Sequence, residues 1–396
     1  MTRFVEFEQA TLKGETKTVT DAGFRGGGLV RRAARRNLVA RSAAGTVNFD
    51  PTTNGFGLFL QYMLGSSATP TSIGNGLYQQ VHNPGSLNGK SFTTQIVTPD
   101  TTGNLAQNAM TYPGCKITDW ALSVAADAQV KLVLTIDALD FATPSNGFAS
   151  TTLSAAATQG ATSISTVAAI PAGAYVTLDT GPLLEVVQTT GAATGTGPYV
   201  STLVTATTLA HATGVYAGSA TGVNYGAATA LQTPSYNATT SEFYYSSGSL
   251  VAGGSTAITS GVFTNTGGVP LAYVRTVTVT GKNSLAVNRT SLGSLLRSEQ
   301  LDNGWRDYTA DVEVEFSSRA AYDRYAADGA TALSLTFTGA NGSKLSIYAP
   351  AAFQETGGQP DVSNADIITL KQKYTFLDDG TNGAIQVVYT SSDATL

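Results

Sequence analysis

Few residues in this chain of 396 residues have the side chains that catalysis usually needs. There are two histidines, His82 and His211, and one cysteine, Cys115. A Ser-His-Asp triad or a metal site needs several such groups to converge, and neither histidine has suitable neighbours in the sequence. We therefore expect both histidines at the surface and Cys115 buried in a structural role. We expect no cofactor, no metal and no enzymatic activity.

The stretch Gly85–Ser91 (GSLNGKS) is similar in composition to a phosphate-binding loop. Its two glycines, Gly85 and Gly89, are separated by three residues where that motif needs four. The residues after it read as a strand rather than a helix. The pattern therefore favours a hairpin turn at Asn88-Gly89.

An acidic alternation marks the stretch Asp311–Phe316 (DVEVEF). In a strand, successive side chains point to opposite faces, so the carboxylates of Asp311, Glu313 and Glu315 share one face of a sheet. On a surface that encloses a channel, these carboxylates would line the channel and repel a passing polyanion. An ordinary solvent-facing strand predicts the same pattern, so both interpretations stay open.

A second charge pattern is a run of arginines without an acidic residue. On a helix these like charges would lie at destabilising i,i+4 spacing, so we expect an extended loop or an acidic partner. The candidates for inter-subunit or inter-ring contacts are Arg25, Arg31, Arg32, Arg35, Arg36 and Arg41. Contact with nucleic acid and a merely solvated loop are the alternatives.

The composition limits the possible partners. Charged residues make up 12% of the chain against about 25% in a typical soluble domain, while 42% are hydrophobic. This suggests that the chain buries further surface against copies of itself. The net charge of −5 disfavours tight binding to nucleic acid phosphates. No signal peptide or run of about 20 apolar residues is evident, so we expect folding in a cytoplasm and no membrane insertion.

Two distant stretches show the same order of expected elements, which indicates an internal duplication. Each has a Thr-Val-Thr strand, a loop rich in Leu, Arg and Ser, a second strand, a short capped helix, an Asn-Gly turn and a long hairpin. In the first stretch the second strand is 45–49, the helix is 55–64 and the hairpin pairs 116–124 with 130–137. In the second stretch the corresponding ranges are 311–316, 319–327, and 367–377 with 384–390. We expect Asn54 to cap the first helix and Ser317 or Ser318 the second, with stops at Gly65 and Gly329.

Between these stretches, residues 150–221 contain no Lys or Arg and are rich in Ala, Thr and Gly. Strand patterns at 174–178 and 183–188 predict a small inserted β module, which we expect on the outside. The predicted domains are 1–149, 150–221, and 222–396, the last with its linker. The fold class is mainly β with short helices, in packed antiparallel sheets that occur twice.

Several motifs, taken in order, resemble major tail tube proteins of long-tailed (siphovirus-type) phages, over most of residues 1–149 and 222–396. They are GFGLFLQYMLGS at 55–66, YPGCKI at 112–117, NSLAVN at 283–288, and DVEVEF at 311–316 with the helix of Tyr322 and Tyr325. The resemblance implies packed antiparallel sheets flanked by a helix, in rings of sixfold or pseudo-sixfold symmetry around a β-barrel lumen. Three chains would complete a ring if each holds two such folds, and six if each holds one; the duplication favours three.

The resemblance also implies a function. The chain would be a structural subunit of stacked rings whose lumen conducts DNA from capsid to host during ejection. Its partners would be copies of itself, the tail tape measure protein, the tail tip and terminator proteins, and DNA that passes without specific binding. It would be assembled in the host cytoplasm and reside in the virion tail.

Two other functional classes stay open. An adhesion module of a phage or cell surface would also be rich in β-structure, but would expose an aromatic patch and need no ring. A hydrolase on a β scaffold would require paired acids with perturbed pKa values in one cleft.

Overall fold

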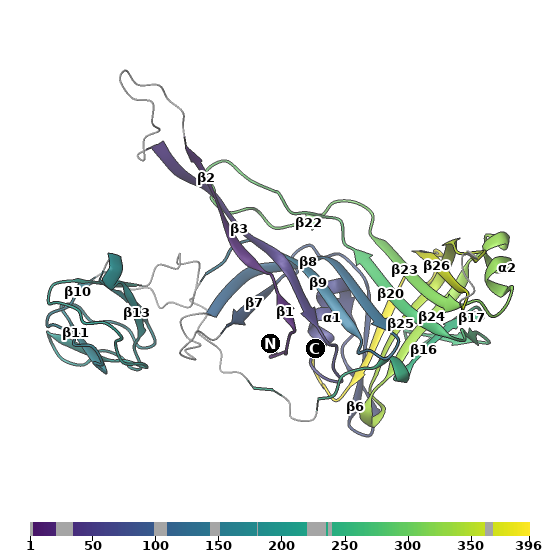
Figure 1. Ribbon diagram of the computed structural model, residues 1–396, viewed down its shortest axis with the longest axis horizontal. Coiled ribbons are helices and arrows are strands. Elements are labelled where there is room, and N and C mark those ends of the chain that lie inside the picture. Colours follow the sequence, from purple (N-terminus) through teal and green to yellow (C-terminus); the bar gives the residue numbers. More distant parts are fainter. Residues whose placement is uncertain are drawn as a thin grey trace, which may run out of the picture. The chain divides into compact units, whose positions relative to one another are not determined.

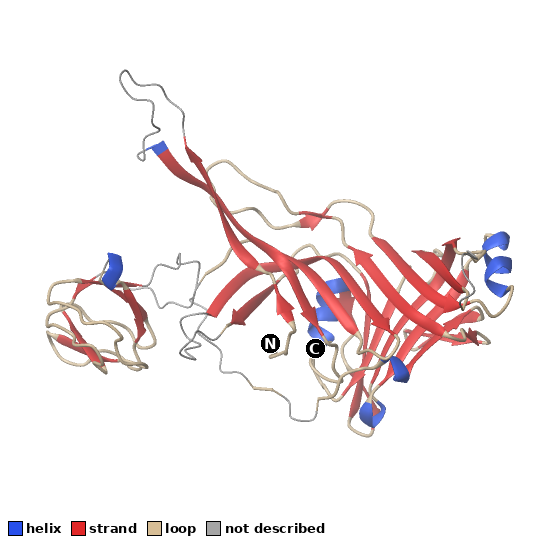
Figure 2. Cartoon of the chain, in the orientation of Figure 1, coloured by secondary structure: helices blue, strands red, loops and turns tan. Residues whose placement is uncertain are grey.

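The computed structural model describes residues 3–20, 35–98, 109–142, 151–179, 181–219, 235–236, 240–360 and 367–396. The chain is mainly β, as expected, and its described residues include two short α-helices (Figures 1 and 2). It divides into two compact units. Unit 1 comprises Met1–Phe92, Gly114–Leu139 and Ser235–Leu396; unit 2 comprises Thr93–Pro113 and Asp140–Pro234. The predicted domain boundaries at 149 and 221 stay predictions.

The main sheet contains a run of eight strands in which each strand is antiparallel to the next. A short strand, β1 (Gln9–Ala10), continues the line of β2 against β3. In spatial order the eight are β2 (Lys13–Thr20), β3 (Arg36–Phe49), β9 (Lys131–Ala138), β8 (Ala109–Ala125), β20 (Val274–Lys282), β23 (Asp307–Glu315), β26 (Thr369–Leu377) and β25 (Lys344–Thr356).

This order contains the same arrangement twice. In β2–β3–β9–β8, the first two strands are followed by the later two in reverse chain order, so that β8 lies outermost. The group β20–β23–β26–β25 repeats this pattern, with β25 outermost. We call these two groups of strands the first and second copies. Pairing between β8 and β20 joins them into one sheet. The duplication inferred from the sequence is therefore present in the strand order.

The first helix, α1 (Gly57–Leu64), follows β3. Its N-cap is Phe56, without a side-chain cap, so the expected capping by Asn54 was wrong. The helix ends as predicted at Gly65, whose φ of 95° suits a residue that lacks a Cβ.

The second helix, α2 (Ala320–Ala327), follows β23 at the corresponding place and lies near the end of the second copy (Figure 1). Arg319 is its N-cap residue, without a side-chain cap, so the expected capping by Ser317 or Ser318 was wrong. The Ser318 hydroxyl accepts a bond of 3.4 Å from the Ala320 amide. The left-handed C-cap is Asp328, one residue before the expected stop at Gly329.

The two long hairpins had different outcomes. The first is confirmed, because β8 and β9 pair from Lys116 opposite Asp137 to Ser123 opposite Lys131. The second was wrong: β26 and β27 (Gln386–Ser391) both run antiparallel to β25, which pairs with β27 through its first half and with β26 through its second half. The two strands are therefore successive segments along one side of β25, and the hairpin equivalent to β8–β9 is β25–β26.

The apolar face of the second copy packs against a second layer. That layer consists of β16 (Gly248–Ala252), β24 (Thr331–Thr338) and the first half of β25. Alternate residues of β20 and β23, such as Val277, Val279 and Val312, are buried between the layers. In the first copy, Phe49 of β3 and Phe59 of α1 pack with ring centroids 5.0 Å apart. The expected packing of antiparallel sheets with a flanking helix is therefore observed.

The remaining strands of the main sheet connect these layers or extend their edges. The strand β6 pairs with β27, and β17 and β18 form a separate hairpin. The remaining strands of the main sheet are β4 (Gly65–Ser67), β5 (Thr71–Gly74), β6 (Leu77–Pro84), β7 (Phe92–Val97) and β19 (Val269–Pro270). Two separate two-stranded sheets are formed by β17 (Ser255–Thr259) with β18 (Val262–Thr266), and by β21 (Leu285–Ala286) with β22 (Leu301–Asp302).

Unit 2 has a small β core of its own. The expected strands at 174–178 and 183–188 correspond to β12 (Tyr175–Leu178) and β13 (Glu185–Gln188), which pair with each other. Leucine, isoleucine, valine and alanine side chains form its interior. Its other strands are β10 (Thr151–Thr152), β11 (Ser163–Thr166), β14 (Tyr199–Thr202) and β15 (Tyr216–Ser219).

Candidate assembly surface

The junction between the two copies is the pairing of β8 with β20. It runs from Thr276 opposite Ala125 to Lys282 opposite Asp119, so an acid faces a lysine at one end. Within it, Gly281 lies opposite Trp120, which is buried. A Cβ at Gly281 would come within 2.3 Å of the indole ring. The close packing of this junction therefore requires glycine at position 281.

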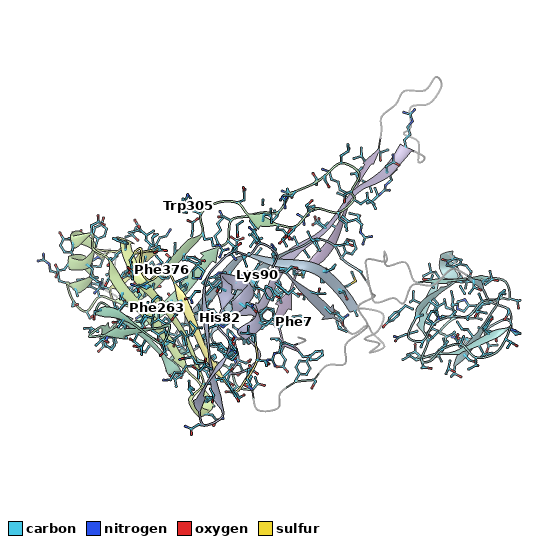
Figure 3. All side chains as sticks on the ribbon, turned by 180° about the vertical axis from the view of Figure 1, so that it is seen from behind. Phe7, His82, Lys90, Phe263, Trp305 and Phe376 are labelled. Atoms are coloured by element: carbon cyan, nitrogen blue, oxygen red, sulfur yellow. The ribbon has the colours of Figure 1, made fainter. Side chains whose placement is uncertain are left out.

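A second pairing joins strands that are far apart in the sequence, one from the first quarter of the chain and one near residue 390. The strand β6 pairs with β27, with His82 opposite Val387. His82 is fully buried, in the body of unit 1 (Figure 3), so the expected surface location was wrong. Burial lowers its pKa from 6.5 to about 3, because the charged imidazolium would lose its hydration. Its ring is therefore neutral at physiological pH.

A long loop of the second copy binds the strands β8 and β9 of the first copy. Residues 283–306, between β20 and β23, form what we call the clamp loop. Its Glu299 and Gln300 bind Lys116 of β8: Nζ donates at 2.6 Å to Glu299 Oε1 and at 2.6 Å to the Gln300 carbonyl. Lys116 is almost fully buried and also donates to the Leu87 carbonyl at 2.7 Å. The bond from Lys116 lowers the pKa of Glu299, so this carboxylate is ionised near neutral pH.

The clamp loop makes a second ion pair with the first copy, and in this pair both partners are buried. Arg297 Nη2 donates to Asp137 Oδ1 at 2.8 Å, and both side chains are largely buried. Gln300 Nε2 donates to the other carboxylate oxygen of Asp137 at 2.8 Å. Burial raises the pKa of Asp137, and the bonds from Gln300 and Arg297 oppose that shift. A buried carboxylate held by two donors fixes the loop in one position on β9.

The stretch similar to a phosphate-binding loop is occupied by carboxylates of the same chain. The Leu87 amide donates to Asp302 Oδ2 at 3.1 Å, and the Gly89 amide donates to Glu299 Oε1 at 2.5 Å. Lys90 donates to the Gly65 carbonyl. A turn at Asn88-Gly89 leads to a strand, as predicted, but the described partners of the preceding strand β6 are β4, β5 and β27, so the expected hairpin is not among the described pairings. The backbone donors of this loop therefore bind the clamp loop.

The acidic alternation lies in β23 as expected. Asp311, Glu313 and Glu315 alternate with the buried residues Val312 and Val314. Phe316 lies one residue beyond the strand, which was expected to end at 316, and is 40% exposed.

This polar face also carries cations. Asp311 lies opposite Lys373 and Glu313 opposite Lys371 on β26. Glu315 accepts a bond from Arg275 Nη2 at 2.8 Å. The face of β20, β23 and β26 is therefore mixed in charge rather than purely acidic.

The arginine-rich stretch is described in part. Arg25, Arg31 and Arg32 lie outside the described residues. Arg35 and Arg36 lie where β3 begins, at the far end of the β2–β3 ribbon, which extends past its neighbouring strands (Figure 1). Arg41 is buried, and its amide donates to the Leu295 carbonyl of the clamp loop at 3.0 Å.

The second histidine is also buried, within unit 2, again against expectation. His211 Nε2 lies 2.9 Å from Glu185 Oε2, and Nδ1 lies 3.6 Å from Asp179 Oδ2. Glu185 also accepts bonds from the Thr208 and Leu209 amides. Burial alone would raise the pKa of Glu185, but the bonds from Thr208, His211 and Leu209 outweigh it and lower that pKa. This network ties the segment around residue 208 to β13.

In the described part of the chain, the side chains that could take part in catalysis or metal binding are packed into the structure instead. Cys115 is fully buried, as predicted. Among the described residues, no group of three or more His, Cys, Asp or Glu side chains could hold a metal ion. No helix in the described ranges is long and apolar enough to cross a membrane.

The sequence did not predict the polar contacts between β8, β9 and the clamp loop. Lys116 belongs to the YPGCKI motif, but its partner Glu299 lies 183 residues away. Asp137 and Arg297 are separated by 160 residues. A buried lysine in a β-strand gives no local signal of its partner, so only the fold reveals the clamp.

These features define a class of protein: a β-rich structural subunit built from two copies of one arrangement, joined strand to strand. A family model described as "Phage tail tube protein" matches residues 2–179 and 169–376, two copies that together span most of the chain. The chain belongs to this family. It is therefore a structural subunit of a phage tail tube and a component of the virion tail. Among curated proteins, no match was found.

Proposed function

We propose that three of these chains close into a ring of pseudo-sixfold symmetry, that such rings stack into the tube of a long-tailed phage, and that its bore conducts DNA during ejection. The observation that carries the proposal is the repeated strand order joined by the β8–β20 pairing. One chain supplies two equivalent sheets side by side. Repeating that step around an axis closes a barrel and satisfies the hydrogen-bonding groups of the strand edges.

The polar face of β23 would line the bore, with Asp311, Glu313 and Glu315 among its groups. Carboxylates repel DNA phosphates. The lysines of β26 directly opposite reduce the net repulsion, and threonines such as Thr278 and Thr309 separate the charges. A face of mixed charge without a basic patch gives passing DNA few strong contacts.

The arginine-rich stretch would contact a neighbouring subunit or ring through Arg25, Arg31, Arg32, Arg35 and Arg36, whereas the buried Arg41 binds the clamp loop of its own chain. The clamp loop offers a precedent within the chain, since Arg297 there binds a buried carboxylate of the other copy. Other partners would be the tape measure, tail tip and terminator proteins. Assembly would take place in the host cytoplasm, and the chain would act without catalysis.

Electron microscopy of the purified chain at rising concentration, with light scattering to count subunits, tests this function. Hollow rings or tubes are expected. Solitary particles that bind glycans would instead favour an adhesion module, for which the 93% exposed Trp305 on the clamp loop offers an aromatic contact (Figure 3).

The bore assignment has its own test, in assembled tubes. Glu313→Lys changes a predicted bore residue by two charges, and Glu6→Lys makes the same change at an exposed residue outside the sheet. We expect tubes of the first variant to retain more DNA at low salt, with a loss of retention as salt rises. Equal retention by both variants would contradict the placement of Glu313 in the bore.

A further inference from the structure

The four-stranded sheet of unit 2 has one buried face and one outer face. Its strands lie in the order β10, β15, β12 and β13, with β10 and β13 at the edges (Figure 1). Val176, Leu178 and Ala217 point from one face into the core of the unit. Residues that alternate with them along the strands point to the opposite face, which we call the outer face. The outer face carries Thr152, Tyr216, Thr177 and Val186, with Gly218 among them.

The ring of Tyr216 lies along this outer face, over Gly218. A Cβ built on Gly218, two residues further along β15, would collide with the hydroxyl oxygen and the nearest ring carbons of Tyr216. The ring therefore packs on the backbone of its own strand, in space that a side chain at position 218 would fill. Tyr216 is still 39% exposed, whereas Tyr175, at the far end of the same face, is buried. The open aromatic surface of this face is therefore centred on Tyr216.

Hydroxyl groups and a small apolar side chain border the ring. Thr152 is exposed directly opposite Tyr216, and Thr177 is half-buried opposite Gly218. Val167, whose amide donates to the Thr152 carbonyl at 3.0 Å, is 60% exposed. An aromatic surface bordered by hydroxyl groups suits a ligand that has an apolar side and polar edges.

The sequence of this module offers such a ligand no opposite charge. Residues 150–221 contain no Lys or Arg, and their only acids are Asp179 and Glu185. Both carboxylates are turned to the buried His211, and their side chains are only 15% and 7% exposed. A polyanion such as DNA needs cations to neutralise its phosphates, and a cationic ligand gains little from carboxylates that are already engaged. These residues therefore favour an uncharged ligand.

We propose that the outer face around Tyr216 is a binding site for a neutral glycan. The C–H groups on one side of a pyranose ring carry a partial positive charge and stack on the open surface of Tyr216, whose π-electrons attract them. The hydroxyls of Thr152 and Thr177 bond to sugar hydroxyls at the edge of that ring. A nucleobase also stacks on tyrosine, but the phosphates of a nucleic acid strand gain no cation from this module.

This site goes beyond the proposed function, because it lies within unit 2 and does not depend on ring formation. On the outside of a tube, where we expect this module, copies of the site would repeat along the tail. Many linked weak sites bind a polymer far more tightly than one site does. The module would thus hold the side of a tail against a surface coated with neutral polysaccharide.

Binding of the full chain to immobilised oligosaccharides tests the site. The probes are hexasaccharides of glucose, mannose, galactose and N-acetylglucosamine, with dextran sulfate and oligothymidylate as charged comparisons. We expect at least one neutral hexasaccharide to bind, and Tyr216→Ala to weaken that binding roughly tenfold. Tyr216→Phe keeps the ring and should retain most of the binding. The matched control is Tyr273→Ala, which removes a 67% exposed tyrosine of unit 1 and should leave the binding unchanged.

Tyrosine nitration of the unmodified chain gives a second readout that does not depend on the folding of a variant. The bound hexasaccharide should slow the nitration of Tyr216 and leave that of Tyr273 unchanged. Four results would each overturn the proposal: no binding of any neutral hexasaccharide, equal binding by Tyr216→Ala, stronger binding of dextran sulfate or oligothymidylate, or nitration of Tyr216 at the same rate with and without the hexasaccharide. Each would leave the proposed tube intact, since none of them measures ring formation.

Discussion

Replacing His82 by leucine should remove a large part of the acid sensitivity of unit 1. His82 is a buried residue of β6, opposite Val387 of β27, and its pKa in the folded chain is about 3 against 6.5 for the free side chain. Between these values the unfolded chain binds a proton that the folded chain does not. The folded state therefore loses stability as the pH falls from about 6.5 to 3, at up to about 1.4 kcal/mol per pH unit.

The size of this loss of stability follows from the pKa shift of His82. Two pH units below 6.5, at pH 4.5, the contribution of His82 is about 3 kcal/mol relative to neutral pH. Other groups titrate over the same range, so the quantity to compare is the difference between the wild type and His82→Leu at each pH. A constant offset from altered packing does not affect this difference in slope.

The assay is urea denaturation at pH 7.0, 5.5 and 4.5, followed by tryptophan fluorescence. Both tryptophans, Trp120 and Trp305, lie in unit 1, so the signal reports this unit. The matched control is His211→Gln, which alters the histidine of unit 2. We expect the variant at position 82 to lose less stability on acidification than the wild type, and the control to behave like the wild type. Equal slopes for His82→Leu and wild type would refute the reasoning.

Two further substitutions test the junction between the copies in the same assay. Lys116→Met leaves two backbone carbonyls without their donor and should destabilise unit 1 by about 2–5 kcal/mol. The control Lys131→Met removes ion pairs near the surface and should cost below about 1 kcal/mol. Equal effects of the two substitutions would contradict the role of buried Lys116 in holding the clamp loop. Gly281→Ala forces a methyl group against Trp120 and should cost about 1–3 kcal/mol. The control Gly329→Ala, where the nearest atom would lie 3.9 Å away, should cost under about 0.5 kcal/mol, and a neutral Gly281→Ala would show that this junction is loosely packed.

The sequence predicted features that depend on neighbouring residues. Period-two alternation predicted β23, and Gly65 marked the end of α1 because a left-handed residue follows the helix. The repeated order of elements indicated the duplication. These signals are local, since each depends on a few adjacent side chains and their backbone preferences.

The sequence did not predict features that depend on distant residues. The segments Ile367–Leu377 and Ala384–Thr390 look like the arms of a hairpin, yet both lie along β25, because strand partners are selected by the whole sheet. The two histidines stand in polar, loop-like contexts, and only the fold shows that they are buried. The partners of Lys116 were hidden for the same reason.

The central claim is that one chain supplies two of the six positions around the tube. Native mass spectrometry of isolated rings, with each chain contributing 40.7 kDa, measures this number directly. The account predicts three chains per ring. Rings of six chains would contradict it, since each chain would then fill a single position despite its two copies.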